Sequence, residues 1–331
     1  MASIMTNASA LTALQSLNAT NKALETTQSR ISTGYRVAEA ADNAAYWSIA
    51  TTMNSDKGAM STVQDALGLG ASKIDTAYTA MNKTIEIVND IKVKVVAAVG
   101  ASAADKDKIQ TEITALQGQL KSYAASATFS GTNWLSVNAT VAAGNPSAGT
   151  HNPAQIVSAF NRDTSGNVTL GKIEIAVQDI KLFDAAATTN TTRGILEGLR
   201  LATSGERNNT AVAATANTVA VTDGYAVSTL TVVGFNDAQI EQMIHIVDTA
   251  LGEMQDAATI LGAAKKQVDQ QKSFTTSLMD SIERGVGQLV DADMNKESTR
   301  LQALQVQQQL GIQALSIANS NSQSILSLFR G

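Results

Sequence analysis

The sequence predicts a mainly α-helical fold with a β-rich insertion. A long antiparallel helical bundle, or coiled coil, would be built from both chain ends and would carry a small outer β domain. Two observations predict this fold. Apolar residues recur at alternating gaps of three and four over long stretches near both ends, which is typical of a coiled-coil seam. The middle of the chain instead places short runs of β-forming residues between Gly, Thr and Asn, which is typical of strands and turns.

The amino-terminal stretch is expected to form the first helix. One apolar stripe recurs along it, at Leu14, Leu17, Leu24 and Ile31. The pattern stops at Ser32-Thr33-Gly34, where a glycine is well suited to end a helix.

Three further heptad seams predict three more helices, over residues 63–99, 109–123 and 240–268. Ser102 and Asp105 have the spacing of a capping box for the second of these helices, and Asn236 is placed to cap the third. Each seam is too narrow to be buried alone, so we expect these helices to pack together as an antiparallel bundle.

Two segments of the insertion are expected to be strands, namely residues 167–177 and 228–235. The stretch from Gly166 to Lys172 has the glycine and lysine spacing of a phosphate-binding loop. Ile173 then stands where that loop needs Ser or Thr to hold magnesium. A hairpin turn is therefore favoured over a nucleotide site, and no cofactor is expected.

Charge and composition exclude several classes of function. The net charge of −5 gives no general attraction for nucleic acid, and the absence of cysteine with only two histidines argues against a metal site. No set of nucleophile, base and orienting group is visible, so an enzyme is not expected. Residues 1–21 lack the charged and continuously apolar regions of a secretory signal peptide, and no window is apolar enough to suggest a membrane span.

Both ends of the chain are uncharged, over residues 1–21 and 301–329. The carboxyl end has two apolar faces, one with Leu301, Leu304, Ile312 and Leu315 and the other with Val306, Leu310, Ala314 and Ile317. Two faces suggest neighbours on two sides, because a helix on the surface of a monomer needs only one. We therefore expect both ends to become ordered helices when copies of the chain associate.

Two separated motifs resemble the bacterial flagellins, the subunits of the flagellar filament. Residues 28–50 match the family at Ser32, Thr33, Gly34, Arg36, Asp42, Ala44 and Ala45. Residues 291–330 match at Asp291, Asp293, Glu297, Gln308, Gln309, Gly311, Ala318, Asn319, Leu326, Ser327 and Leu328. Tyr46-Trp47 stands where the family commonly has Gly-Leu. That pair, together with residues 156–177, is similar to the rhizobial, alphaproteobacterial type.

This resemblance implies a subunit that self-assembles into a helical filament used as a propeller for swimming. Residues 1–42 and 288–331 would form an inner coiled-coil layer, residues 43–186 and 235–287 a helical rod with β-hairpins, and residues 187–234 a small variable outer domain. The implied partners are further copies of the chain or sister flagellins, the flagellar export apparatus, an export chaperone, and the hook-associated and cap proteins. Neither nucleic acid nor a membrane is implied. The protein would be extracellular, exported without a cleaved signal peptide.

The residues expected to carry assembly are Leu14, Leu17, Leu24, Ile31, Trp47, Leu304, Leu310, Leu315 and Ile317. For Trp47, packing at a subunit contact or helix junction is favoured over a hot spot for another partner. Asp291 and Asp293 are interpreted as the acidic start of a helix rather than as a catalytic pair. A hook–filament junction protein and a cytoplasmic signalling coiled coil remain as alternatives.

Overall fold

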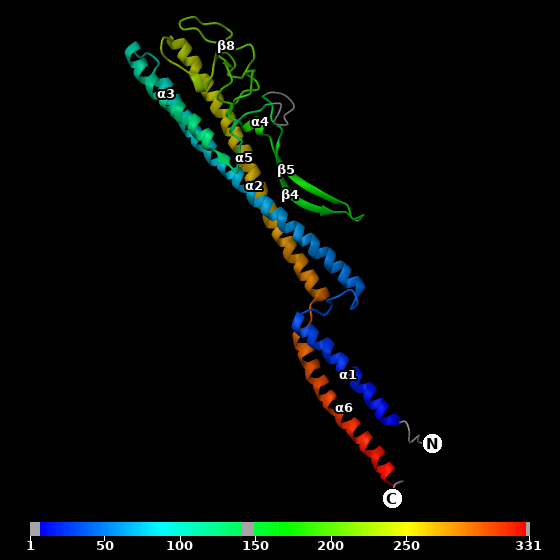
Figure 1. Cartoon of the computed structure of the whole chain (residues 1–331). Helices are drawn as coiled ribbons and strands as arrows, with labels where there is room; N and C mark the ends of the chain where they lie inside the picture. The colour runs from blue at the N-terminus through cyan, green and yellow to red at the C-terminus, as the bar shows by residue number, and fades with distance from the viewer. Residues whose placement is uncertain (1–6, 141–148, 164, 329–331) are drawn as a thin grey trace. The chain divides into compact units, whose positions relative to one another are not determined.

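The computed structural model describes residues 7–140, 149–163 and 165–328, with side-chain surroundings described up to residue 320 (Figure 1). The chain forms two compact units. The first, here called the terminal unit, comprises Met1–Ala59 and Leu278–Gly331, and the second, the central unit, comprises Met60–Ser277.

The helices confirm the predicted mainly α-helical class. They are α1 (Ala8–Thr33), α2 (Ala44–Ala97), α3 (Ala103–Ser126), α4 (Val177–Ile180), α5 (Asp237–Val290) and α6 (Met294–Leu328), with a short 3-10 helix η2 (Val227–Thr229). Helices α2 and α5 contribute residues to both units. Gly34, with φ of +77°, ends α1 where the sequence predicts, because glycine adopts the left-handed conformation without steric cost.

Most of the described strands have only two or three residues. The strands are β1 (Thr128–Phe129), β2 (Thr132–Asn133), β3 (Ser136–Val137), β4 (Ala154–Arg162), β5 (Val168–Ile175), β6 (Phe183–Asp184), β7 (Arg200–Leu201), β8 (Val212–Ala213) and β9 (Asp223–Tyr225). Strands β1 and β2 pair antiparallel, as do β4 and β5, while β3 and β6 pair parallel. Strand β9 lies between β7 and β8 in a three-stranded sheet.

The predicted strand over residues 167–177 is present as β5, which pairs with β4 in a hairpin. Its turn is held by Asp163, whose backbone N–H donates to the Asn167 carbonyl at 2.9 Å, and Gly166 has φ of +86°. The segment from Gly166 to Lys172 therefore forms a hairpin turn and the start of β5, and not a phosphate-binding loop.

The predicted strand over residues 228–235 is wrong. Within the central unit this segment begins as η2 and continues as a loop whose backbone is bound by side chains of α3. The Val232 N–H donates to Gln110 Oε1 at 2.8 Å, and Gln117 Nε2 donates to the Val227 carbonyl at 2.9 Å. These glutamines replace a pairing strand, which a sequence pattern of β-forming residues cannot reveal.

Helices α2, α3 and α5 form the predicted bundle of the central unit, and Figure 1 shows α3 running alongside α2. Salt bridges on the rim join α2 to α5 through Lys92 and Asp248 at 2.5 Å, and α3 to α5 through Lys106 and Asp237 at 3.1 Å. The predicted caps are confirmed, since the Asp105 N–H donates to Ser102 Oγ at 3.3 Å and the Gln239 N–H donates to Asn236 Oδ1 at 2.9 Å.

Every second buried position of α2 after residue 74 lies one residue before the position that the sequence predicts. The heptad seam expected over residues 63–99 places Tyr78, Ile85, Lys92 and Val99 on the buried face, whereas the buried positions are Ala77, Thr84, Ile91 and Ala98. The buried residues keep an alternation of four and three from residue 63 to residue 98, and small residues hold several of these positions, where the larger residue next in sequence attracts the prediction. Tyr78 and Ile85 are half-buried at the edge of that face.

Two ion pairs stabilise the insertion, one buried within it and one that joins it to α5. Lys181 Nζ lies 2.7 Å from Asp184 Oδ2, and both side chains are fully buried. Arg200, also fully buried, binds the Glu253 carboxylate with two hydrogen bonds of 2.8 and 2.7 Å. Both pairs are completed by backbone contacts, because the Lys181 ammonium donates to the Gly149 carbonyl and the Arg200 guanidinium donates to the Gly205 carbonyl.

These pairs predict that acid destabilises the central unit. Burial raises the pKa of Asp184 and of Glu253 and is the largest single effect on each. It is outweighed at Asp184 by the hydrogen bonds and charge of Lys181 together with backbone N–H donors, and at Glu253 by the hydrogen bonds and charge of Arg200 together with the charge of Arg207, so both pKa values are lowered. A carboxyl whose pKa is lower in the folded state stabilises fully above its unfolded pKa, and this contribution is lost as pH falls through the folded pKa. We expect the urea midpoint to stay constant above about pH 5 and to fall below about pH 4.

Urea unfolding followed by circular dichroism between pH 3 and pH 7 measures this dependence. The variant Glu253→Gln should be less stable at neutral pH and should have a shallower decline, because glutamine does not titrate. A variant with the same decline as the wild type would contradict the contribution assigned to Glu253.

Candidate assembly interface

The terminal unit contains an antiparallel helix pair, α1 with α6. Half-buried or buried residues repeat along α1 at Ala10, Ala13, Leu17, Thr20, Leu24, Thr27 and Ile31, and along α6 at Leu301, Leu304, Gln308, Gly311, Leu315 and Ala318. The spacing on both helices alternates between three and four residues, as in a coiled coil. This set, here called the terminal seam, holds few large apolar side chains, so the pair is weakly stabilised by its own burial.

Polar contacts fix the register of the terminal seam. Asn7 Nδ2 donates to the Ala318 carbonyl at 2.9 Å near one end, and Gln308 Nε2 donates to Asn21 Oδ1 at 2.8 Å further along. Near the other end, Arg30 Nη1 lies 3.5 Å from the buried Glu297 carboxylate. Polar pairs at defined seam positions disfavour slipped registers, because any shift leaves them without partners.

The opposite side of α6 exposes apolar residues. Val306 is 55% exposed, Leu310 58% and Ile317 68%. Successive helical residues turn by about 100°, which places these three within roughly 40° of one another and away from Leu304 and Leu315 in the seam. We call Val306, Leu310 and Ile317 the outer stripe. No charged residue lies between Leu301 and Ser320 on this helix, so the outer stripe has no charged border of its own.

The structure divides the predicted assembly residues between these two surfaces. Leu17, Leu24, Ile31, Leu304 and Leu315 lie in the terminal seam, while Leu310 and Ile317 lie in the outer stripe.

Two residues do not lie on the stripe predicted for them. Leu14 is 44% exposed, and the neighbouring Ala13 occupies the seam position instead. Ile312 is 54% exposed instead of lying beside Leu304, because eight residues turn the helix roughly 80° past two full turns.

The family-motif residues mainly shape the connection between the helices of the terminal unit. The Ala292 N–H donates to the Gly34 carbonyl at 2.8 Å, and Arg36 Nη2 donates to the Leu289 carbonyl at 2.8 Å. Asp42 Oδ2 accepts from the Ala38 N–H at 3.0 Å. These contacts hold residues 34–42 against the end of α5.

The acidic residues before α6 contribute to local structure, as a helix cap and in a β-bridge. Asp293 Oδ1 accepts from the Asn295 and Lys296 N–H groups at 3.0 and 3.2 Å, which caps α6 as predicted for an acidic helix start. Asp291 forms an isolated β-bridge with Tyr35. Ser32 and Asn319 are exposed, while the predicted motif residues Leu326, Ser327 and Leu328 lie outside the described side chains.

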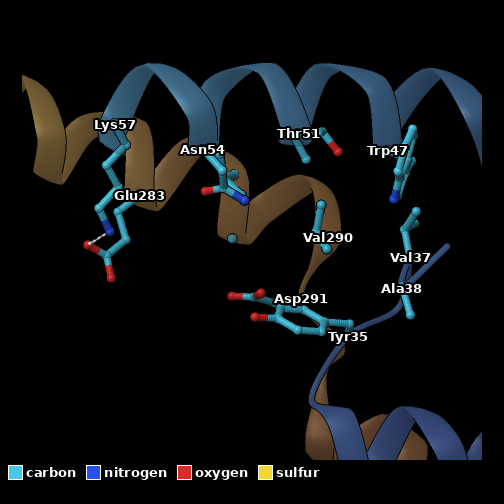
Figure 2. A pocket seen from close by; sticks show the side chains of 13 residues that line it. Tyr35, Val37, Ala38, Trp47, Thr51, Asn54, Lys57, Glu283, Val290 and Asp291 are labelled. Atoms are coloured by element: carbon cyan, nitrogen blue, oxygen red, sulfur yellow. Dashed lines mark hydrogen bonds and ion pairs between the residues drawn. The ribbon is translucent and has the colours of Figure 1, made fainter. Parts of the chain in front are cut away.

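A pocket of about 450 Å³ opens within the terminal unit, between the start of α2, the end of α5 and residues 35–38 (Figure 2). Its floor contains the buried residues Val37, Ala50 and Val290. Trp47 also lines the pocket. Its side chain remains 40% exposed, so the indole is not buried in the core of the isolated chain.

The pocket of the terminal unit was not predicted from the sequence. A signal for it was present, because Tyr35, Tyr46 and Trp47 are clustered in a chain with only 4% aromatic residues, and all three are at least 40% exposed. The Arg36 guanidinium also lies 6.0 Å from the centre of the Tyr46 ring, which adds a cation–π contact to this cluster.

Residues 7–140, 149–163 and 165–328 contain no group of His, Asp and Glu side chains placed to hold a metal ion. In the same part of the chain, none of the helices is long and apolar enough to cross a bilayer.

Comparisons with known proteins agree with the resemblance of the two terminal motifs. Residues 4–140 match the family model of the bacterial flagellin N-terminal helical region, and residues 244–329 match that of the bacterial flagellin C-terminal helical region. These matches contain α1, α2, α3 and α6 completely, together with most of α5.

Full-length relatives have the same family name. Flagellin C of Rhizobium meliloti (strain 1021) is 48% identical over 334 residues, and a flagellin of Brucella melitensis biotype 1 is 50% identical over 332 residues. Flagellin A of Rhizobium meliloti is 42% identical over 404 residues. Each alignment covers 100% of this chain and 100% of the relative. With both terminal regions matched and relatives similar along their whole length, the chain belongs to the bacterial flagellin family.

Proposed function

We propose that this flagellin, a structural subunit of the bacterial flagellar filament, polymerises by covering the outer stripe of α6 with a neighbouring copy. The observation that carries the proposal is the exposure of Val306, Leu310 and Ile317 on the side of α6 that faces away from α1. Covering three half-exposed aliphatic side chains contributes about 3–6 kcal/mol per contact.

The composition of the terminal helices suits a contact between subunits in which polar groups bond to one another or to enclosed water. Gln, Asn and Ser separate the apolar residues of α6 from Leu301 onward, and no charge has to be desolvated there. A buried unpaired charge would cost several kcal/mol, whereas amides and hydroxyls can bond to one another or to water. This composition supports the placement of residues 1–42 and 288–331 in an inner layer of the filament.

The proposed contact is between two different surfaces. The terminal seam is occupied within each copy by α1 and α6, so the outer stripe has to meet another part of its neighbour. A contact between unlike surfaces does not close on itself and propagates as a helical polymer. Residues 43–186 and 235–287 would then form the rod around the inner layer, and residues 187–234 the outer domain.

The further partners follow from the family and are part of the proposal. The subunit would pass through the flagellar export apparatus with an export chaperone, without a cleaved signal peptide, and would add below a cap protein beyond the hook-associated proteins. Its place would be extracellular. Sister flagellins are candidates for mixed filaments, since Rhizobium meliloti has proteins named flagellin A and flagellin C that are both similar to this chain. Nothing in the family comparisons supports a hook–filament junction protein or a signalling coiled coil.

Hydrogen exchange on dilute subunits and on filaments tests the proposal. We expect amides of α1 and α6 to exchange fast in the isolated subunit and slowly in the filament, because the terminal seam alone gives little burial. Amides of α2 and α5 in the central unit should be protected in both samples and serve as the internal control. Protection of α1 and α6 in the dilute subunit, with no filaments in negative-stain images after salt-induced association, would contradict the proposal.

A further inference from the structure

We propose that the pocket of the terminal unit binds a cationic side chain from a second copy of this chain, and that this side chain is Arg300. The inference rests on the proposed function and adds a second, polar contact to the one made by the outer stripe. It starts from the groups that line the pocket.

Polar side chains converge on the pocket from opposite sides. Figure 2 shows Thr51 and Asn54 pointing into the space from α2, with Tyr35 and Asp291 facing them from the other wall. Among the described residues, none of these four side chains has a hydrogen-bond partner. Two hydroxyls, an amide and a carboxylate are therefore free to bind a further group in a space of about 450 Å³.

The charge of the pocket favours a cation. Three charged residues line it, and two of them neutralise each other, since Lys57 Nζ lies 2.8 Å from Glu283 Oε2. Asp291 remains as a carboxylate without a cationic partner among the described residues. The aromatic faces of Tyr35 and Trp47 on the same walls attract a cation as well.

A guanidinium fits this set better than an ammonium. It is planar, donates in two directions to a carboxylate, and can stack on an aromatic ring while its remaining N–H groups reach hydroxyl and amide oxygens. A lysine ammonium also has three donors, but it cannot form two parallel bonds to a carboxylate or stack flat on an aromatic ring.

Arg300 is the guanidinium of the terminal unit that is available for this contact. The other described arginines there already have partners, because Arg30 binds Glu297, Arg36 binds the Leu289 carbonyl and Arg284 binds Ser281. Arg300 is exposed, and no ion pair or hydrogen bond of its side chain is found among the described residues.

Arg300 also has a suitable position on α6. It lies about 80° around the helix from Leu310 and about 40° from Leu304, between the outer stripe and the terminal seam. A neighbour that covers the stripe and extends over this edge of α6 would meet Arg300. The contact joins unlike surfaces of two copies, as polymerisation requires.

A charge exchange tests the pairing in filaments of the full-length chain. Asp291→Lys and Arg300→Glu should each raise the critical concentration for polymerisation at least about tenfold, because each leaves one charge without its partner. The double variant Asp291→Lys/Arg300→Glu should return to within about threefold of the wild type. Glu25→Lys on the exposed part of α1 makes the same charge change outside the pocket and should have little effect.

The outcomes distinguish the Arg300 pairing from a Lys296 pairing and from a failure of the proposed function. Circular dichroism of every variant first establishes that the subunit is folded, and Asp291→Asn gives a milder change if the lysine variant is not. If Asp291→Asn and Arg300→Glu polymerise as the wild type does, or if the double variant is no better than the single ones, the inference fails while the proposed function stands. Rescue of Asp291→Lys by Lys296→Glu instead would assign the pocket to Lys296 and overturn the choice of Arg300. Failure of the wild type itself to polymerise would contradict the proposed function.

Discussion

Replacement of Leu310 by aspartate is expected to abolish filaments while the subunit still folds. Leu310 is 58% exposed on α6 and contributes to no core of the isolated chain, so the change costs the monomer little. In the filament the same change removes an apolar contact worth about 1–2 kcal/mol and places an unpaired carboxylate in the contact, which costs several kcal/mol more.

The expected loss exceeds about a hundredfold in the critical concentration, because each 1.4 kcal/mol corresponds to a factor of ten. Sedimentation of the polymer and negative-stain microscopy measure it. Two variants serve as matched controls. Leu310→Met keeps an apolar side chain of similar size, and Gln305→Asp introduces the same charge at an exposed position on another side of α6. Both should polymerise, and filaments of normal length from Leu310→Asp would refute the role of the outer stripe.

Removal of Lys181 should destabilise the central unit severely. The ammonium lies against the Asp184 carboxylate, and neither side chain is exposed. In Lys181→Ala the carboxylate keeps its hydrogen bonds from the Ala139 and Ala186 N–H groups but loses its counter-ion. A buried charge left without its partner costs about 3–5 kcal/mol.

The chain contains a matched control for this buried pair. Lys83 and Glu86 have the same spacing of three residues and a similar distance of 2.8 Å, but their side chains are 55% and 64% exposed. Lys83→Ala should leave the Tm almost unchanged, since exposed pairs contribute little. Lys181→Ala should lower the Tm by about 6 °C or more. Equal effects of the two substitutions in calorimetry would contradict the assigned cost of burial.

Periodicity predicted the helical part of the fold well because helix formation depends on residues close in sequence. The end of α1 at Gly34 and the caps at Ser102 and Asn236 follow from local chemistry alone. The exact seam of α2 did not follow, because Ala77, Thr84 and Ala98 are small and only their packing against distant helices reveals that they are buried. The loop at residues 227–232 was missed for a related reason, since its backbone partners are side chains more than 100 residues away.

The candidate interface was predictable in part. The uncharged ends and the two apolar faces of residues 301–329 could be seen in the sequence, and the structure assigns Leu304 to the terminal seam and Leu310 to the outer stripe. The pocket beside Trp47 could not be predicted. Its walls come from Tyr35, Asn54 and Asp291, which only the fold brings together.

The glutamines of α3 have a consequence for a protein that works at very high local concentration. Had the loop at residues 227–232 formed an open edge strand, its free N–H and carbonyl groups could have paired with the same edge of another molecule and templated cross-β aggregation. Gln110 and Gln117 occupy several of these groups from the side of a helix. A filament subunit, whose copies lie close together, is thereby protected at this segment from pairing edge to edge.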